Sequence, residues 1–166
     1  QSIFETNSFL IKNKDTKLIE YAAFFGSIQI FHFLILNNVQ ISPSLWLYAI
    51  HGKNPEIIHL LEQNLDDSEY KPYKQFFLES IKCHHNEIAI YIKDSFLQNG
   101  VENSSEIFVK KLKYRNFALI ENDFNDRSFL YHLCKYNYAF IVDEILKSPV
   151  IDINQVFIPK RKFFFK

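Results

Sequence analysis

The chain has 166 residues, of which 48% are hydrophobic, including eighteen phenylalanines and nine tyrosines. A disordered chain lacks this many large apolar side chains, so the composition excludes disorder and predicts a folded core. Nineteen basic residues balance nineteen acidic residues, and this neutral total disfavours nucleic acid or a membrane surface as a partner.

The first apolar segment runs from Leu18 to Leu36 and is long enough to raise the question of a membrane span. Glu20, Gln29 and His32 interrupt it, which argues against a span. Gly26 divides the segment where a left-handed residue would let a helix end and the chain reverse. We therefore expect two short buried helices and no membrane contact.

The second segment repeats the layout of the first. The run Leu18–Ala23 returns 27 residues later as Leu45–Ile50, and residues 29–34 return at the same offset as residues 56–61. Helix starts are predicted at Ser42-Pro43 and at Asn54-Pro55, because a polar N-cap followed by proline favours the first helical turn. His32 and His59 occupy matched positions, and we expect them to share a packing role.

Further copies follow along the chain. A third copy comprises residues 76–81 and 87–92, at an offset of 31. The segment 104–125 has the length of a degenerate unit, and a clearer copy follows in which Asn137 takes the place of Gly26. Each copy holds two short apolar segments with helical spacing, so the sequence predicts repeated helical hairpins and no strands.

One such hairpin buries too few side chains to offset the entropy that its ordering costs, so successive units must stack. The predicted fold class is therefore all-α, an ankyrin-like helical-hairpin solenoid of about five repeats in a single domain over 1–166. The predicted units are residues 16–41, 43–66, 72–100, 104–125 (degenerate) and 126–154, with residues 155–166 as a tail or truncated next repeat.

These units resemble ankyrin repeats. The ankyrin pattern of paired alanines, a glycine, a Glu-Ile-Val run and a leucine corresponds to Ala22, Ala23, Gly26, Gln29, Ile30, Phe31 and Leu34, and the late copy adds Asp152, Ile153 and Asn154. The segment Leu45–Leu61, with the preceding serine, and the segment Ile81–Ile88 look like a divergent group abundant in protists and described as a domain of unknown function. The Thr-Pro-Leu-His start of ordinary ankyrin units is absent, and the short spacing implies short connecting loops.

The resemblance implies a binding module that holds a protein or peptide on the concave face of its inner helices. The residues at the matching positions are Tyr21, Phe24, Tyr48, His51, Glu79, Lys82, His132, Lys135 and Tyr136. A row of rings with scattered charges suits a protein or peptide ligand. The alternatives are that these side chains pack between neighbouring helices, that the chain is a structural spacer in a larger repeat protein, or that it is an enzyme with an unrecognised site.

The sequence contains no pattern that indicates a metal-binding or catalytic site. Cys83, His84 and His85 are adjacent and lack a second cluster at zinc-finger spacing, so no metal site is predicted. No glycine-rich phosphate loop, nucleophile elbow or carboxylate pair in a catalytic context occurs, and we expect neither enzymatic activity nor a cofactor. Cys83 and Cys134 are too few for a disulfide scaffold, so a reducing, cytoplasmic compartment is expected.

Two observations concern the ends of the chain. It begins at Gln1 and contains no methionine, which predicts that it is a fragment of a longer protein. Lys160, Arg161, Lys162 and Lys166 form the one dense basic cluster, which we interpret as a tail or truncated next repeat in preference to a targeting signal. The oligomeric state is left open, with a monomer favoured.

Overall fold

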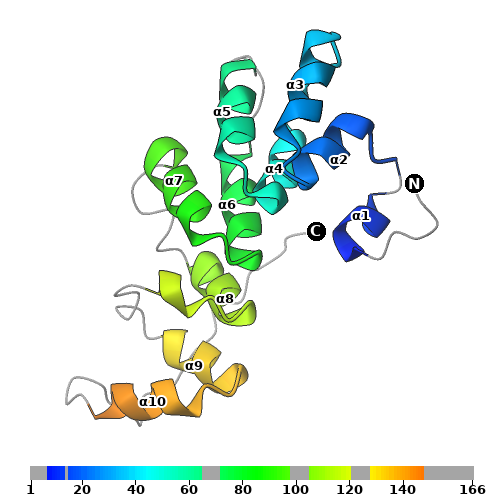
Figure 1. Ribbon diagram of the computed structural model, residues 1–166. Helices are drawn as coiled ribbons and strands as arrows, with labels where there is room; N and C mark the ends of the chain where they lie inside the picture. Colours follow the sequence, from blue (N-terminus) through cyan, green and yellow to red (C-terminus); the bar gives the residue numbers. More distant parts are fainter. Residues whose placement is uncertain (1–6, 14, 65–71, 98–104, 121–127, 148–166) are drawn as a thin grey trace, which may run out of the picture. The chain divides into compact units, whose positions relative to one another are not determined.

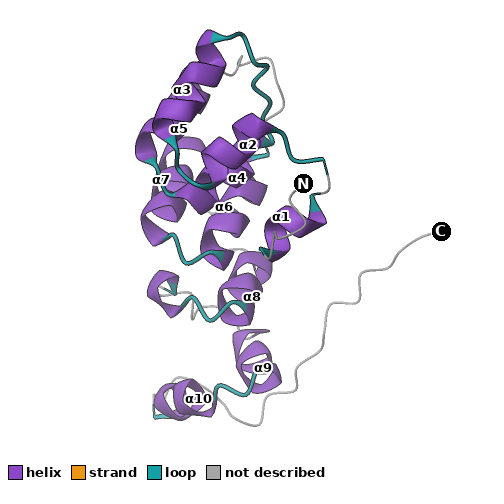
Figure 2. Cartoon of the chain, turned by 45° about the vertical axis from the view of Figure 1, so that its right-hand side comes forward, coloured by secondary structure: helices purple, strands orange, loops and turns teal. Residues whose placement is uncertain are grey.

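The computed structural model describes residues 7–13, 15–64, 72–97, 105–120 and 128–147. Every regular element in these ranges is a helix (Figure 2), which confirms the all-α class for this part of the chain. The chain divides into two compact units, residues 1–97 and 98–166, and each is described by itself. The predicted five-repeat solenoid would extend over both units and stays a prediction.

The first unit is built from helix pairs. The first helices of successive pairs lie side by side in chain order, α2 against α4 and α4 against α6, and α3 packs against α5 (Figure 1). The described helices of this unit are α1 (Ser8–Lys12), α2 (Leu18–Phe24), α3 (Ile28–Leu36), α4 (Leu45–Gly52), α5 (Pro55–Asn64), α6 (Tyr73–Lys82) and α7 (Asn86–Phe96).

These pairs fall within the predicted units 16–41, 43–66 and 72–100. The apolar segment from Leu18 to Leu36 is two short helices, as expected, but α3 is not a buried helix, because Ile30, Phe33 and Leu36 are exposed. None of the described helices is both long and apolar enough to cross a membrane. The expected shared packing role of His32 and His59 is wrong as far as burial is concerned, because both side chains are exposed on the second helices of their pairs. The His59 ring meets Tyr91 of the next pair edge-on at 6.0 Å between centroids, and the His59 side chain lies within 3.1 Å of Glu62.

Aromatic stacking joins the second and third pairs. Trp46 on α4 is fully buried, and its ring stacks on Phe76 of α6 with 5.4 Å between centroids. Tyr73 and Phe96 extend this group, with their rings parallel at 4.3 Å. Rings of this size bury a large apolar area in one contact, which is how a short helix can be fixed to its neighbour.

Each helix pair turns through one left-handed residue. Gly26 and Asn137 were predicted for this conformation and adopt it, with φ of 64° and 58°. The amide of Ser27 donates to the carbonyl of Ala22 at 2.8 Å, which closes the helix with the hydrogen bond of a Schellman motif. The corresponding turn positions that the sequence did not mark are Lys53, His84 and Arg115, all with positive φ.

The two predicted helix starts differ in outcome. Asn54 caps α5 as expected, because its Oδ1 accepts from the amide of Glu56 at 3.0 Å while its Nδ2 donates to the carbonyl of Gly26 at 3.1 Å. The start at Ser42-Pro43 lies too early, since α4 begins at Leu45. The preceding turn is held instead by hydrogen bonds between residues three apart, as from the Leu45 amide to the Ser42 carbonyl.

The second unit has a smaller described core. Its described elements are α8 (Ser105–Lys113), the 3-10 turn η2 (Phe117–Leu119), α9 (Ser128–Lys135) and α10 (Ala139–Leu146). Phe108, Leu112 and Leu133 are buried together, and the Tyr138 hydroxyl donates to the Leu112 carbonyl at 2.8 Å. Within the degenerate segment 104–125, the described residues 105–120 form one helix and a single 3-10 turn. Asp152–Asn154 and the tail 155–166 lie outside the described residues.

A hydrogen bond from Tyr91 on α7 to α5 makes the stability of the fold depend on pH in the alkaline range. The Tyr91 hydroxyl donates to Glu62 at 2.6 Å, and burial, followed by this carboxylate, raises the Tyr91 pKa to about 12. The pKa of Tyr91 in the folded state lies above its unfolded value of about 10. The stability that the Tyr91 hydroxyl contributes is therefore complete below pH 10 and is lost as pH rises towards 12.

We expect Tyr91→Phe to cost about 1 kcal/mol at pH 8, the usual worth of one hydrogen bond. The difference from wild type should shrink as pH rises from 9 to 11.5, measured by urea unfolding. A constant difference over this range would contradict the assignment.

Candidate functional site

The predicted binding residues of the first unit come from the inner helices α2, α4 and α6. Phe24, Tyr48, His51, Glu79 and Lys82 lie at or near the C-terminal ends of these helices. Phe24 and Tyr48 are buried, with 9% and 6% of their surfaces exposed, whereas His51 and Glu79 are partly exposed. The alternative of packing between helices therefore describes Phe24 and Tyr48 better than free exposure does.

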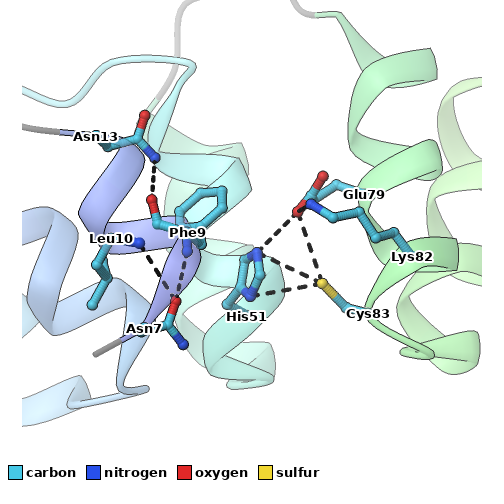
Figure 3. Close-up of polar contacts among 8 residues, drawn as sticks. All are labelled: Asn7, Phe9, Leu10, Asn13, His51, Glu79, Lys82 and Cys83. Atoms are coloured by element: carbon cyan, nitrogen blue, oxygen red, sulfur yellow. Dashed lines mark hydrogen bonds and ion pairs between the residues drawn. The ribbon is translucent and has the colours of Figure 1, made fainter. Parts of the chain in front are cut away.

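The aromatic part of this face is occupied by helix α1. The Phe9 ring lies 4.2 Å from the His51 ring, 5.1 Å from Tyr48 and 5.8 Å from Phe24, all between centroids. Figure 3 shows Phe9 beside His51. We call Phe24, Tyr48 and His51 the aromatic cradle. It holds one ring supplied by a segment of the same chain.

Helix α1 is short but well defined at both ends. The Asn7 side chain accepts a hydrogen bond from the Phe9 amide at 2.9 Å, and the Asn13 side chain donates to the Phe9 carbonyl at 2.9 Å (Figure 3). Leu10 is fully buried. Sequence reasoning missed this helix because it has five residues, fewer than two turns, and no repeat partner. The N-cap asparagine before an apolar run was the available signal.

The polar part of the face begins where the cradle ends. Glu79 Oε1 lies 3.0 Å from His51 Nε2 and 2.6 Å from Lys82 Nζ. Burial alone would raise the Glu79 pKa, but hydrogen bonds from His51 and Lys82 outweigh burial and lower the pKa below its usual value. Glu79 is therefore a carboxylate at neutral pH and accepts hydrogen bonds from both neighbours.

Cys83 also belongs to this polar group. The sequence had suggested testing it for metal binding only together with the adjacent His84 and His85. Its Sγ lies 3.6 Å from both ring nitrogens of His51 and 3.9 Å from Glu79 Oε1 (Figure 3). Burial and the Glu79 charge raise the Cys83 pKa to about 11. His84 is exposed at the left-handed turn, while burial and then the charges of Lys53 and His51 lower the His85 pKa to about 4.

The remaining predicted residues do not join this group. Tyr21 lies on α2 and stacks on Phe25 at 6.2 Å between centroids. In the second unit, Lys135 Nζ lies 5.8 Å from the centre of the Tyr136 ring, and the His132 ring contacts Tyr131 edge-on at 5.4 Å. These three residues of α9 and its C-terminal turn, His132, Lys135 and Tyr136, belong to a separate unit from the cradle.

Comparison of the chain with protein-family models, with curated proteins and with solved structures found no match. The resemblance to ankyrin repeats therefore stays a prediction from the residues of the chain. The geometry of the site indicates its chemistry. The site holds the aromatic side chain of Phe9, and beside this ring lie a carboxylate, an imidazole, a thiol and an ammonium group.

Proposed function

We propose that this chain is a protein-interaction module that binds a protein or peptide segment on the face formed by α2, α4 and α6. The observation that carries the proposal is the insertion of Phe9 into the aromatic cradle. A short helix of this chain already uses the face in the manner proposed for a partner. This supports a ligand segment that is short, helical and carries an aromatic residue.

The two parts of the face would contribute differently to recognition. Ring contacts of the kind that Phe9 makes stabilise a complex by about 0.5–1.5 kcal/mol each beyond area burial, so the cradle supplies affinity. Glu79 and Lys82 lie at the rim, with the Lys82 side chain 41% exposed. Rim charges mainly set orientation and association rate, so these two would select partners of matching charge.

Because α1 occupies the cradle, a partner must compete with Phe9. Phe9→Ala in the full chain removes the competing ring. We expect a labelled peptide copying residues 7–13 to bind this variant at least about tenfold more tightly than it binds wild type, because a self-ligand that fills a site lowers apparent affinity in proportion to its occupancy. Fluorescence anisotropy in the presence of a metal chelator measures this.

Matched variants decide where the peptide binds. Adding His51→Ala to Phe9→Ala should abolish the gain, because one wall of the cradle is lost. Phe33→Ala is the control, since Phe33 is an aromatic residue of α3 that is 64% exposed and lies outside the cradle. Equal peptide binding by all four proteins, or none by Phe9→Ala, would contradict the proposed face.

The same four proteins serve as baits to identify the natural partner. A partner of the cradle is expected to be enriched on Phe9→Ala relative to wild type, unchanged on Phe33→Ala and lost on the double variant, as measured by quantitative mass spectrometry. A partner captured equally by all four would bind elsewhere on the chain.

A further inference from the structure

Three different metal-ligating atoms meet at the polar end of the inner face. His51 offers a ring nitrogen, Glu79 a carboxylate oxygen and Cys83 a sulfur, and these atoms all lie within 4.8 Å of one another. His51 belongs to α4, whereas Glu79 lies on α6 and Cys83 directly follows it. All three residues are partly buried, so the packing of α4 on α6 fixes the backbone positions from which they extend (Figure 3).

The distances between these atoms resemble one face of a coordination tetrahedron. Zinc binds nitrogen and oxygen at about 2.0–2.2 Å and sulfur at about 2.3 Å, which places tetrahedral ligand atoms roughly 3.3–3.6 Å apart. The observed separations are 3.0 Å from His51 Nε2 to Glu79 Oε1, 3.6 Å from Cys83 Sγ to the His51 nitrogens and 3.9 Å from Cys83 Sγ to Glu79 Oε1. Because Cys83 Sγ is equally far from both ring nitrogens, completing the face requires the His51 ring to turn its Nε2 lone pair towards the space between Sγ and Oε1, together with shifts of a few tenths of an ångström.

The donor set selects the metal. Calcium and magnesium take oxygen ligands, so a site with nitrogen and sulfur does not suit them. Imidazole, thiolate and carboxylate together suit zinc, which accepts all three and is usually four-coordinate. We propose that His51, Glu79 and Cys83 form a zinc site with three protein ligands and a fourth position open to water or to a group from a partner.

Two lysine side chains next to the three ligands supply positive charge when no metal is bound. Lys82 Nζ contacts Glu79 at 2.6 Å, and the charge of Lys53 also acts on Cys83. Both lysines are exposed, so their ammonium groups can move into water when a cation arrives. Zinc then replaces Lys82 as the positive partner of Glu79. The Cys83 thiol releases its proton to the buffer as the zinc–sulfur bond forms, because the thiolate is the ligand.

This site goes beyond binding in the cradle, although the two share His51. Zinc would bind a ring nitrogen at the edge of the imidazole that Phe9 contacts, and it would fasten α4 to α6. Its test needs no partner, so its outcome is independent of whether a peptide binds the face.

Cobalt titration of the reduced, metal-free full chain tests the proposal. Cobalt adopts zinc-like sites and reports a bound thiolate by a near-ultraviolet charge-transfer band, with visible bands whose strength indicates four-coordination. We expect one cobalt per chain and loss of the bands when zinc is added. Cys83→Ser should remove the charge-transfer band. His51→Gln and Glu79→Gln should weaken cobalt binding at least about tenfold, because the loss of an outer-shell partner already costs this much and a direct ligand contributes more.

Three controls keep the result interpretable. Cys134→Ser removes the other, exposed cysteine and should leave the bands unchanged. Lys82→Ala removes the competing ammonium group and should tighten binding. Zinc should raise the melting temperature of wild type and of Cys134→Ser but not of Cys83→Ser, because a ligand that binds the folded state stabilises it. Absence of a thiolate band in wild type, or its loss in Cys134→Ser rather than in Cys83→Ser, would overturn the proposal.

Discussion

Gly52→Ala is expected to destabilise the protein by about 3 kcal/mol or more, at the upper end of what single substitutions cost. Gly52 is the last residue of α4 and touches the end of α2 through its backbone. A Cβ at this position would lie 2.1 Å from the Ala23 carbonyl oxygen and 2.9 Å from the Gly26 amide nitrogen. Those atoms belong to the backbone and cannot rotate away as a flexible side chain would.

The sign of this effect distinguishes the contact from helix propensity. Alanine in place of glycine ordinarily favours a helix by about 1 kcal/mol, so a stabilised variant would show that the close approach of α2 and α4 is absent. Urea unfolding followed by far-ultraviolet circular dichroism measures the difference. Gln63→Ala, on the exposed side of α5, is the control and should change the free energy of unfolding by less than about 0.5 kcal/mol.

Trp46→Ala is expected to cost about 3–5 kcal/mol, the usual range for truncating a fully buried large aromatic side chain. Trp46 is 1% exposed, and its ring stacks on Phe76 and meets Tyr73 and Phe96 edge-on. The cavity would open between α4 and α6, the two helices that carry His51 and Glu79. The same unfolding measurement, by circular dichroism because the only tryptophan is removed, gives the free-energy change.

A second substitution separates the loss of the whole ring from the loss of part of it. The buried Nε1 of Trp46 has no hydrogen-bond partner, so Trp46→Phe keeps a ring against Phe76 and gives up no bond. It should cost less than half as much as Trp46→Ala. Phe33→Ala removes an exposed ring of α3 and should be nearly neutral. Similar costs for Trp46→Ala and Phe33→Ala would contradict the central position of Trp46.

The helix pairs of the first unit could be predicted from the amino-acid sequence alone. Apolar spacing, the Asn54-Pro55 start and the turn at Gly26 are local signals, because each depends on residues within one helical turn of its own position. Signals of this kind also explain why Lys53, His84 and Arg115 were missed. Their side chains favour a left-handed backbone much less than glycine does, and the helices packed on either side impose that conformation.

The residues that meet on the inner face could not be predicted in this way, because they come from helices far apart in the sequence. Phe9 reaches Tyr48 across 39 positions of the sequence, and His51 reaches Glu79 and Cys83 across 28 and 32. Spacing along one helix predicts which residues share its face, but the atoms that converge between helices depend on how α1 and α6 pack against α4. For that reason the sequence predicted a binding row residue by residue, whereas the occupied cradle and the three-ligand cluster required the packed helices.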